Sequence, residues 1–344
     1  MYLCSRKKIR QMAELQKKIL ITGASGFIGS FLVEQALTEG YEVWAAVRAT
    51  TSRRYLQDSR IRFVELDLSS DERLQAQLSE HVKENGAWQY VIHAAGATKC
   101  RSKEDFFRVN TYGTERLVRL LLQTKALTGR FVFVSSLSVM GDLGQHTDGQ
   151  PHPNTAYGQS KWEAEQLLAK LKGLDYVVLR PTGVYGPRER DYFLMAKSIA
   201  GHVDFSVGYK KQELTFIYVR DLVAAAFLAL EKGKCGESYF LTDGFSYSSR
   251  TFSDLLQSEM GVRCVLHLTA PLWVLKAVCY ISEKVGRLTG NVTALNMDKY
   301  NILKQRNWNC DISAARRDLG YSPTYGLERG VIETVAWYKK EKWI

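Results

Sequence analysis

The sequence predicts an α/β protein: a doubly wound parallel sheet of the Rossmann type, with a smaller, discontinuous C-terminal substrate domain. Two observations carry this prediction. Short apolar runs rich in β-branched residues recur along the chain, and the stretches between them are long enough to hold a helix each. The runs are apolar without alternation, which indicates strands covered on both faces, as strands of parallel sheets are. Strands that alternate with helices are typical of the doubly wound fold.

The first strand is expected at KILIT, residues 18–22, where glycines follow and apolar residues at helical spacing cover 27–37. The next apolar runs continue the same alternation. They predict further strands at residues 41–47, 61–66, 90–93, 131–135 and 176–179.

After Arg180-Pro181 the alternation stops. A strand at 214–218 and a helix at 222–230, with Asp221 as the helix N-cap, are expected to return the chain to the sheet. A ligand is then expected in the crevice between the sheet and the remaining segments. We expect residues 1–16 to form a flexible basic tail. Residues 17–186 and 213–236 are expected to form the sheet domain, and residues 187–212 and 237–344 the substrate-binding domain.

Composition excludes several classes of protein. With 344 residues, 45% of them hydrophobic, the chain can bury a large core without disulfides or metals. Its six cysteines form no CxxC pair and have no histidine at ligand spacing, so we expect reduced thiols and no metal site. The net charge of +11 arises from basic residues interleaved with acids, which indicates a solvated surface and no nucleic-acid groove.

No apolar targeting segment follows the basic residues near the N-terminus, so a cytoplasmic protein is expected. The most apolar helical stretch is PLWVLKAVCYISEKV, residues 271–285, and it is too short in apolar residues to span a bilayer. We therefore expect no integral membrane segment. We interpret 271–285 as a core or lid helix of the second domain, and contact with a membrane surface beside an apolar substrate is the alternative.

Glycines at GxxGxxG spacing follow the first strand and open a helix. In that context Gly23 permits a tight turn, Gly26 lets the backbone approach a pyrophosphate, and Gly29 lets the helix pack on the strand. The helix N-terminus then faces the phosphate charge. The sheet domain is thus predicted to bind a dinucleotide, with contacts from Gly23, Ser25, Gly26, Phe27, Ile28 and Gly29.

The end of the second strand indicates which dinucleotide. The acid that would bind a ribose 2′-hydroxyl, about 20 residues after the glycines, is missing, and Arg48 stands there. A guanidinium suits a 2′-phosphate, with Arg53 and Arg54 as helpers, so NADP(H) is predicted over NAD(H). The alternative is that these arginines are only solvated.

Two further strand ends are candidate cofactor contacts. Asp67-Leu68 closes the third strand, where a carboxylate can accept a hydrogen bond from an adenine amino group. The small residues Ala94, Ala95 and Gly96 close the fourth and leave room for a cofactor. We interpret His93, just before them, as a packed, hydrogen-bonded histidine and not as a catalyst.

Catalytic groups are expected at the same edge of the sheet. Tyr157 and Lys161 are four residues apart and therefore share one face of a helix, which continues with apolar residues. Burying the Lys161 ammonium on such a face costs free energy unless it serves a polar site. Ser136 follows the strand expected at 131–135. Asn110 lies on the apolar stripe of another helix, where a buried amide needs partners. It either anchors a water that relays protons to Lys161 or caps or bends its own helix.

These motifs together resemble a family. The segments TGASGFIG, HAAG, the Asn110 helix, VSSLSVMG, YGQSK, LRPTGVYGP and FIYVRDLVAAA occur in the order and spacing of the extended short-chain dehydrogenase/reductases, from about Lys17 onward. The VR at the second strand, PLWVLKAV and DISAARRDLGYSPTYGLERGV are most similar to the 3β-hydroxysteroid dehydrogenase and dihydroflavonol reductase branch.

The resemblance implies roles for individual residues. Ser136, Tyr157 and Lys161 would form the catalytic triad, and Asn110 would join it. The resemblance also implies a homodimer built from the helices of residues 103–124 and 155–171. The residues expected to flank the nicotinamide are Pro181, Thr182, Gly183 and Val184.

Departures from the family pattern favour simple carbonyl and alcohol chemistry. Met140 replaces a tyrosine common in sugar-nucleotide epimerases, and Leu137-Ser138 stands where dehydratases carry an Asp-Glu pair. In the expected mechanism Tyr157 protonates the carbonyl oxygen while Ser136 holds it. Lys161 and the nicotinamide charge are expected to lower the pKa of the phenol.

We therefore expect an NADP(H)-dependent oxidoreductase that interconverts a ketone and a secondary alcohol on a hydrophobic small molecule, such as a steroid, terpenoid or flavonoid. A nucleotide-sugar epimerase or reductase is the alternative, and a non-catalytic dinucleotide sensor is the second. The residues that would bind a sugar diphosphate in the first alternative are Arg188, Arg190, Lys210 and Lys211.

Overall fold

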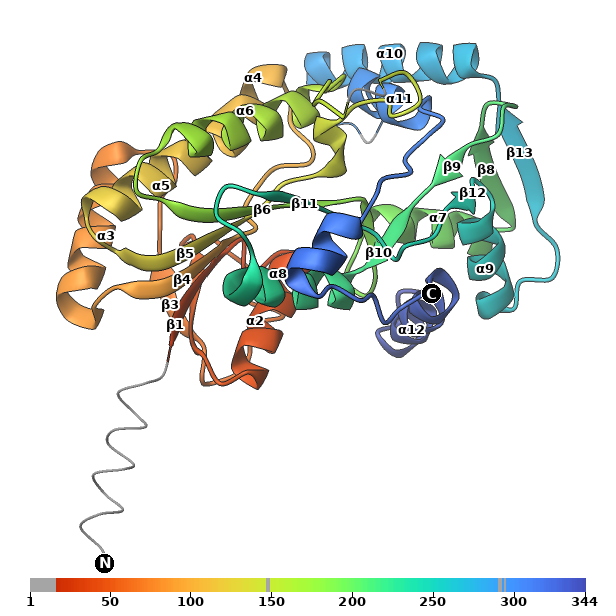
Figure 1. Ribbon diagram of the computed structural model, residues 1–344. Helices are drawn as coiled ribbons and strands as arrows, with labels where there is room; N and C mark the ends of the chain where they lie inside the picture. Colours follow the sequence, from red (N-terminus) through yellow and green to blue (C-terminus); the bar gives the residue numbers. More distant parts are fainter. Residues whose placement is uncertain (1–16, 147–148, 290–292, 294) are drawn as a thin grey trace, which may run out of the picture.

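A seven-stranded parallel sheet forms the centre of the computed structural model, which describes residues 17–146, 149–289, 293 and 295–344 (Figure 1). The expected basic tail, 1–16, therefore lies outside the described residues. The strand order is β11-β6-β5-β4-β1-β2-β3. The strands are β1 (Lys18–Thr22), β2 (Glu42–Val47), β3 (Arg62–Glu65), β4 (Trp88–His93), β5 (Leu127–Val134), β6 (Asp175–Pro181) and β11 (Ser238–Leu241).

Helices cover both faces of this sheet, which confirms the predicted doubly wound fold. On one face α2 (Phe27–Thr38) and α8 (Val219–Lys232) share a core with the inward residues of the strands (Figure 1). On the other face lie α3 (Asp71–Asn85), α5 (Gly113–Gln123) and α6 (Ala156–Lys170). Because β1 neighbours β4, the chain changes direction at this point of the sheet, where open α/β folds bind their ligands.

The strand expected at 214–218 does not join the main sheet. It splits into β9 (Glu213–Leu214), which pairs with β12 (Tyr247–Ser248), and β10 (Phe216–Tyr218), which pairs with β7 (Gly183–Tyr185). The place beside β6 is taken by β11, which lies in the part of the chain that we expected in the substrate domain. Helix α8 packs against β5 and β6. The chain therefore returns to the sheet after this helix, so that β11 extends the sheet and β10 does not.

Asp221 is not the N-cap of α8, which is a correction of the sequence-based expectation. The cap position is Tyr218, and it makes no side-chain capping bond. The Asp221 carboxylate instead accepts hydrogen bonds from the Thr324 amide at 3.0 Å, the Thr324 hydroxyl at 2.7 Å and the Tyr325 amide at 2.9 Å. These three donors attract the carboxylate toward the C-terminal segment and tie that segment to the start of α8.

A second core lies beside the end of the sheet. Tyr185, Phe216, Phe252 and Val331 belong to it. The remaining elements of this part of the chain are α7 (Asp191–Ala200), β8 (Val203–Val207), α9 (Thr251–Met260), β13 (Leu266–Ala270), α10 (Leu272–Thr289), α11 (Met297–Leu303) and α12 (Leu327–Lys340). The short helix η3 (Ala315–Leu319) packs on the main core beside α8 and β11.

Helix α10 contains most of the apolar segment 271–285, and it lies on the surface. Leu275 and Cys279 are buried, whereas Trp273 and Ile281 are exposed. The expectation that this segment forms a core helix is therefore wrong. Across the described part of the chain, no helix has the length and apolarity needed to cross a bilayer.

Burial of His81 between two tryptophans predicts acid sensitivity. Its ring stacks on the Trp88 ring with centroids 3.9 Å apart, and the Trp44 centroid is 4.4 Å away. Desolvation, with Lys18 acting in the same direction, lowers the pKa of His81 from 6.5 to about 4, against an opposing contribution from Glu42. Between these two pH values the unfolded chain binds the proton and the folded chain does not, so stability falls as the pH falls through this window.

We expect the free energy of unfolding from urea denaturation to be lower at about pH 5 than at about pH 7. The variant His81→Phe keeps an aromatic ring in the stack and removes the titrating group. Its loss of stability between the two pH values should be smaller than that of the wild type, and an equal loss would contradict the assignment to His81.

Candidate active site

The glycine loop between β1 and α2 has a backbone that side chains would not allow. Gly23 has a φ of +67°, and a Cβ on it would lie 2.7 Å from the Ala95 nitrogen. A Cβ on Gly29 would lie 2.0 Å from the Gly23 carbonyl oxygen, so the packing of α2 on the loop requires glycine. The Gly26 amide closes the turn on the same carbonyl at 2.9 Å. The loop thus lies against the end of β4 as well as the end of β1.

The start of α2 fits the phosphate groups of a dinucleotide. Gly26 is the N-cap and offers no side-chain acceptor to the amides of the first turn. Such amides carry partial positive charge and bind anions. Ser25, Phe27 and Ile28 lie in this loop and first turn and are all partly exposed.

His93 serves structure, as expected from the sequence. Its Nδ1 lies 2.7 Å from the Thr22 hydroxyl and its Nε2 2.9 Å from the Thr114 hydroxyl. Since Thr114 donates its own proton to the Asn110 carbonyl, Nε2 donates to Thr114 and Nδ1 accepts from Thr22. Desolvation, with a smaller contribution from Lys161, lowers the pKa of His93 to about 3, so the ring is neutral and locks β4 to β1.

Arg48 lies exposed at the end of β2, in a turn where its backbone is bonded to that of Thr51. The two expected helpers contact other groups. The Arg53 guanidinium lies 4.1 Å from the centroid of the Phe63 ring, and Arg54 pairs with Glu341 at 3.4 Å. Arg48 is therefore the guanidinium of this set that most directly suits a 2′-phosphate.

Asp67 and Leu68 follow β3 in a short turn. The Asp67 carboxylate accepts from the Ser69 amide at 2.9 Å and pairs with Arg73 at 2.9 Å. The Leu68 carbonyl accepts from Arg116 at 2.7 Å. These bonds fix the turn at the carboxyl edge of the sheet, and a contact to adenine stays a prediction.

Ser136, Tyr157 and Lys161 lie beyond the end of β5, which is Val134. The Ser136 side chain lies near Tyr157 and opposes the rise in the pKa of Tyr157 that burial causes. Lys161 is 4% exposed, and its ammonium donates to the Val134 carbonyl at 2.9 Å. Desolvation lowers the pKa of Lys161 to about 8, against an opposing contribution from Glu165.

The expected lowering of the pKa of Tyr157 is not found in the chain alone. Burial removes water from the phenol, and the pKa rises. The ammonium of Lys161 is bonded to a carbonyl oxygen and is not among the causes that act on the phenol. Tyr157 is therefore protonated at neutral pH, which is the form that a general acid needs.

Asn110 lies in η1 (Phe107–Tyr112), a π-helical stretch that bends the helix leading into α5. Its Oδ1 accepts from the Ala97 amide at 2.8 Å, and its Nδ2 donates to the Ala97 carbonyl and the Ser160 hydroxyl, each at 3.0 Å. A Cβ on Gly96 would lie 3.1 Å from Oδ1 and 3.2 Å from Lys161 Nζ. Asn110 thus reaches the surroundings of Lys161 and also lies in a bent helix, and the water relay stays a prediction.

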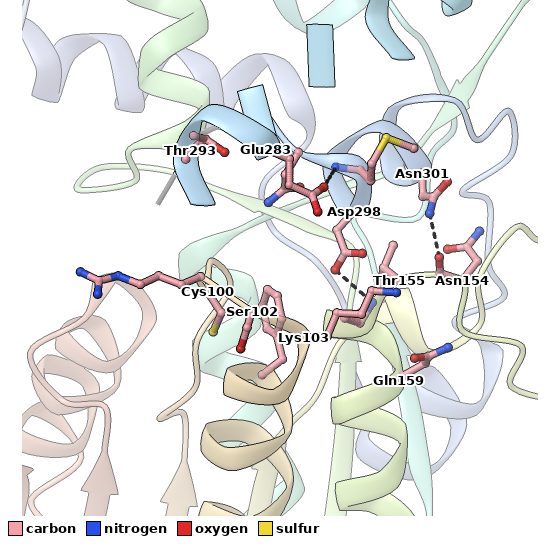
Figure 2. Close-up of a pocket in the computed structure, with 16 residues that line it drawn as sticks. Cys100, Ser102, Lys103, Asn154, Thr155, Gln159, Glu283, Thr293, Asp298 and Asn301 are labelled. Atoms are coloured by element: carbon pink, nitrogen blue, oxygen red, sulfur yellow. Dashed lines mark hydrogen bonds between the residues drawn. The ribbon is translucent and has the colours of Figure 1, made fainter. Parts of the chain in front are cut away.

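A pocket of about 340 Å³ opens at the start of α6, where Thr155, Ala156 and Gln159 line it (Figure 2). The loop after β4 and α4 (Lys103–Phe106) form one side, and α10 and α11 form the other. Asp298 of α11 accepts from the Ala156 amide at 3.0 Å and the Tyr157 amide at 3.4 Å, and so caps the helix that carries the phenol (Figure 2). The lining residues are Cys100, Arg101, Ser102, Lys103, Phe106, Asn154, Thr155, Ala156, Gln159, Glu283, Gly286, Thr293, Asn296, Met297, Asp298 and Asn301.

Helix α10 borders the pocket, and its role as a lid stays a prediction. It contributes Glu283 and Gly286 to the pocket, while its exposed apolar side chains do not line it.

Comparison with known proteins decides the family. Residues 19–241 match the sequence profile described as "NAD dependent epimerase/dehydratase family". The chain belongs to this family. The prediction of an extended short-chain dehydrogenase/reductase, and of an NAD(P)-dependent enzyme, is confirmed at that level.

Members of the epimerase/dehydratase family resemble the chain over nearly its whole length. A putative dihydroflavonol 4-reductase of Synechocystis is 28% identical and covers 94% of the chain and 95% of its own length. A sterol-4-alpha-carboxylate 3-dehydrogenase of Dictyostelium discoideum is 25% identical over 92% and 99% of the two chains. Relatives at similar identity include a farnesyl-quinoline oxide ketoreductase, a UDP-glucose 4-epimerase and a dTDP-glucose 4,6-dehydratase.

Solved structures of the epimerase/dehydratase family share the fold. A dTDP-glucose 4,6-dehydratase of Bacillus anthracis, solved in complex with NAD, aligns with a TM-score of 0.74 at 22% identity. The alignment covers 95% of this chain and 98% of the other. The doubly wound sheet with its helical layers is thus the fold that the family uses.

Two contacts near the site were not predicted from the sequence. Glu165 and Arg180 form a buried ion pair at 2.5 Å, and the Ser135 hydroxyl also donates to Glu165. An acid four residues after Lys161, on a face that is otherwise apolar, is a signal that points to this pair. Asp298 has no such signal, because the contact with α6 joins residues that are far apart in sequence.

Proposed function

We propose that this protein is an NADP(H)-dependent oxidoreductase that interconverts a ketone and a secondary alcohol on a hydrophobic small molecule. The observation that carries the proposal is the placement of Ser136 just beyond β5 and near Tyr157 of α6, with Lys161 one turn along the same helix and its ammonium on the Val134 carbonyl at the end of β5. This group lies at the sheet edge that also holds the glycine loop. Gly96 connects the two, since it follows Ala95 beside Gly23 and lies beside the Lys161 ammonium.

The side chains support one sequence of proton steps. In the reductive direction Tyr157 donates its phenolic proton from Oη to the carbonyl oxygen, and the Ser136 hydroxyl holds the same oxygen. Lys161, whose pKa is about 8, is largely charged at neutral pH. Its ammonium is bonded to the Val134 carbonyl before the reaction, and we propose that it turns toward the phenolate that proton transfer leaves behind. The glycine loop, the first turn of α2 and Arg48 would hold the cofactor, which supplies or accepts the hydride when bound.

Two observations support the proposed substrate class. Leu137 and Ser138 beside Ser136 provide no carboxylates for the elimination of water. Curated relatives named for sterol, dihydroflavonol and farnesyl-quinoline substrates support a hydrophobic ketone. We further propose that residues 187–212 and the chain after β11 make up the substrate-binding part.

A nucleotide-sugar epimerase is the second candidate, because Arg101 and Lys103 line the pocket and offer positive charge. The basic residues expected for a diphosphate lie elsewhere. Arg188 bonds to Ser30 at 2.8 Å and to Glu34 at 2.5 Å, both on α2. The residues lining the pocket do not include Arg190, Lys210 or Lys211.

A cofactor absorbance assay tests the proposal. Purified protein is supplied with NADPH or NADH and a panel of steroid, terpenoid and flavonoid ketones and UDP-sugars. We expect NADPH to be consumed with a hydrophobic ketone. Epimerisation of a UDP-sugar without net change in cofactor would establish the second candidate instead, and cofactor binding without turnover of the panel would favour a sensor.

Cofactor choice gives a further prediction. Replacing Arg48 with alanine removes a charge-assisted contact to the 2′-phosphate, and we expect the Kd for NADPH to rise about 10- to 100-fold. The Kd for NADH should stay within about twofold. Fluorescence titration measures both. Arg60→Ala is the matched control, because Arg60 is exposed and pairs with Asp58 at 2.7 Å; an equal effect of both variants on NADPH would contradict the role of Arg48.

We also propose a homodimer built on the helices of 103–124 and 155–171. Val109 and Tyr112 support it, because they are 41% and 53% exposed on η1 and are available to a partner helix. Leu120 and Leu121 pack within the chain and do not contribute to this argument. Sedimentation velocity of the wild type and of Tyr112→Glu tests the assignment.

A further inference from the structure

Helix α10 exposes a broad apolar surface. The exposed fractions are 74% for Trp273, 61% for Ile281 and 88% for Leu288, and the spacing of these residues places them on one side of the helix. Tyr280 and Val285 lie beside them and are 56% and 50% exposed. Clusters of exposed apolar side chains of this kind mark interaction sites. We call this surface the outer face of α10, comprising Trp273, Lys276, Ala277, Val278, Tyr280, Ile281, Lys284, Val285 and Leu288.

The charge on this surface has one sign. Lys276 and Lys284 are exposed, and the Lys284 ammonium lies 5.6 Å from the centroid of the Tyr280 ring. The only acid of α10 in the sequence is Glu283, which is turned to the pocket and accepts from the Met297 amide at 3.0 Å. Among the described side chains of α10, the exposed ones are thus neutral or positive, in a chain with a net charge of +11.

This chemistry matches an anionic lipid surface better than a second copy of the chain. A helix with Trp, Tyr and aliphatic groups on one face and lysines among them is typical of helices that lie in the membrane interface. The stems of the lysines can lie along the apolar phase while their ammonium groups reach the lipid phosphates. A symmetric contact between two copies would instead bring Lys276 and Lys284 close to the same lysines of the other copy.

The opposite side of α10 borders the pocket. Glu283 and Gly286 line it, and Asp298 and Asn301 of the neighbouring α11 lie across from the start of α6 (Figure 2). A single helix therefore separates the outer face from the pocket at the start of α6, the helix that carries Tyr157. A substrate that is dissolved in a bilayer would need to travel only past the edge of α10 to reach this pocket.

We infer that the outer face of α10 docks on an anionic membrane surface and that the enzyme takes its hydrophobic substrate from that membrane. The identity of the substrate rests on the proposed function, whereas the docking does not. In the docked protein, α10 lies in the plane of the membrane interface. The pocket lies on the side of α10 that faces away from the membrane.

Co-sedimentation with lipid vesicles tests docking. We expect the full-length protein to bind vesicles that contain phosphatidylglycerol, to bind pure phosphatidylcholine more weakly, and to be released as salt is added. The variant Trp273→Ser/Ile281→Ser/Leu288→Ser should lose at least about 10-fold in binding. Lys276→Gln/Lys284→Gln should lose the preference for phosphatidylglycerol.

The matched control is Ile332→Ser, since Ile332 is 44% exposed on α12, which lies toward the bottom of the view in Figure 1 while α10 lies at the top. It should bind vesicles like the wild type. Docking is refuted if the wild type does not bind phosphatidylglycerol vesicles or if the control loses as much binding as the triple variant. A triple variant that changes only the oligomeric state in sedimentation velocity would assign the outer face to contact between copies.

Turnover of a short, water-soluble ketone without vesicles separates this inference from the proposed function. The triple variant should keep that turnover, because none of its three side chains lines the pocket. Loss of vesicle binding with intact turnover confirms the role of the outer face. Vesicle binding by a wild type that reduces no ketone would contradict the proposed function and leave docking standing.

Discussion

Replacing Tyr157 with phenylalanine is expected to lower kcat by about 10²- to 10⁴-fold, the usual contribution of a positioned acid. The change removes only the phenolic hydroxyl, while the ring keeps its edge contact with Phe106, whose centroid lies 6.2 Å away. The pKa of this phenol is raised by burial, so the wild type holds the proton that the variant lacks. Steady-state rates with NADPH and a hydrophobic ketone measure the effect.

Cofactor binding should survive the same substitution, because the glycine loop lies on different elements, β1 and α2. A Kd for NADPH close to that of the wild type is expected from fluorescence titration. Tyr112→Phe is the control, since this tyrosine is exposed on the neighbouring η1 and should keep full turnover. Normal turnover by the Tyr157 variant would refute the catalytic assignment.

The parts of the fold that follow from local patterns could be predicted from the sequence. The strand from Lys18 to Thr22, the glycine turn and α2 are contiguous, and their composition indicates both the turn and its ligand class. Tyr157 and Lys161 share a face because helical spacing requires it. The proximity of Gly23 to Ala95, and of Lys161 to Gly96, follows once parallel strands bring their carboxyl ends to one edge.

The predictions that were wrong or missing concern contacts between segments that are far apart in the sequence. The strand Ser238–Leu241 is short and alternates in burial, so its pattern is weaker than that of 214–218, which nevertheless stays outside the main sheet. Asp221 stands at a position typical of an N-cap, yet three donors from Thr324 and Tyr325 outweigh the local preference. Asp298 caps the catalytic helix from more than a hundred residues away, and local spacing carries no information on such contacts.

Removal of Glu165 is expected to give the largest loss of stability. Arg180 is 8% exposed, and its guanidinium makes three contacts of 2.5 to 3.3 Å with this carboxylate. In Glu165→Leu the guanidinium stays buried without its partner, which costs about 3–5 kcal/mol of unfolding free energy. Urea denaturation should show this loss. The double variant Glu165→Leu/Arg180→Met should recover most of it, because two apolar side chains of similar volume need no charge partner.

The same carboxylate also acts on the catalytic lysine. Glu165 opposes the desolvation that brings the pKa of Lys161 to about 8, so the isosteric Glu165→Gln should move that pKa further down. Lys161 then loses its charge at lower pH, and the alkaline limb of the kcat profile that reports its deprotonation is expected to shift to lower pH. Lys170→Gln, at the far end of the same helix, provides the control and should leave the limb in place. A profile unchanged in Glu165→Gln, measured where the variant is still folded, would show that the pair stabilises the fold without tuning the site.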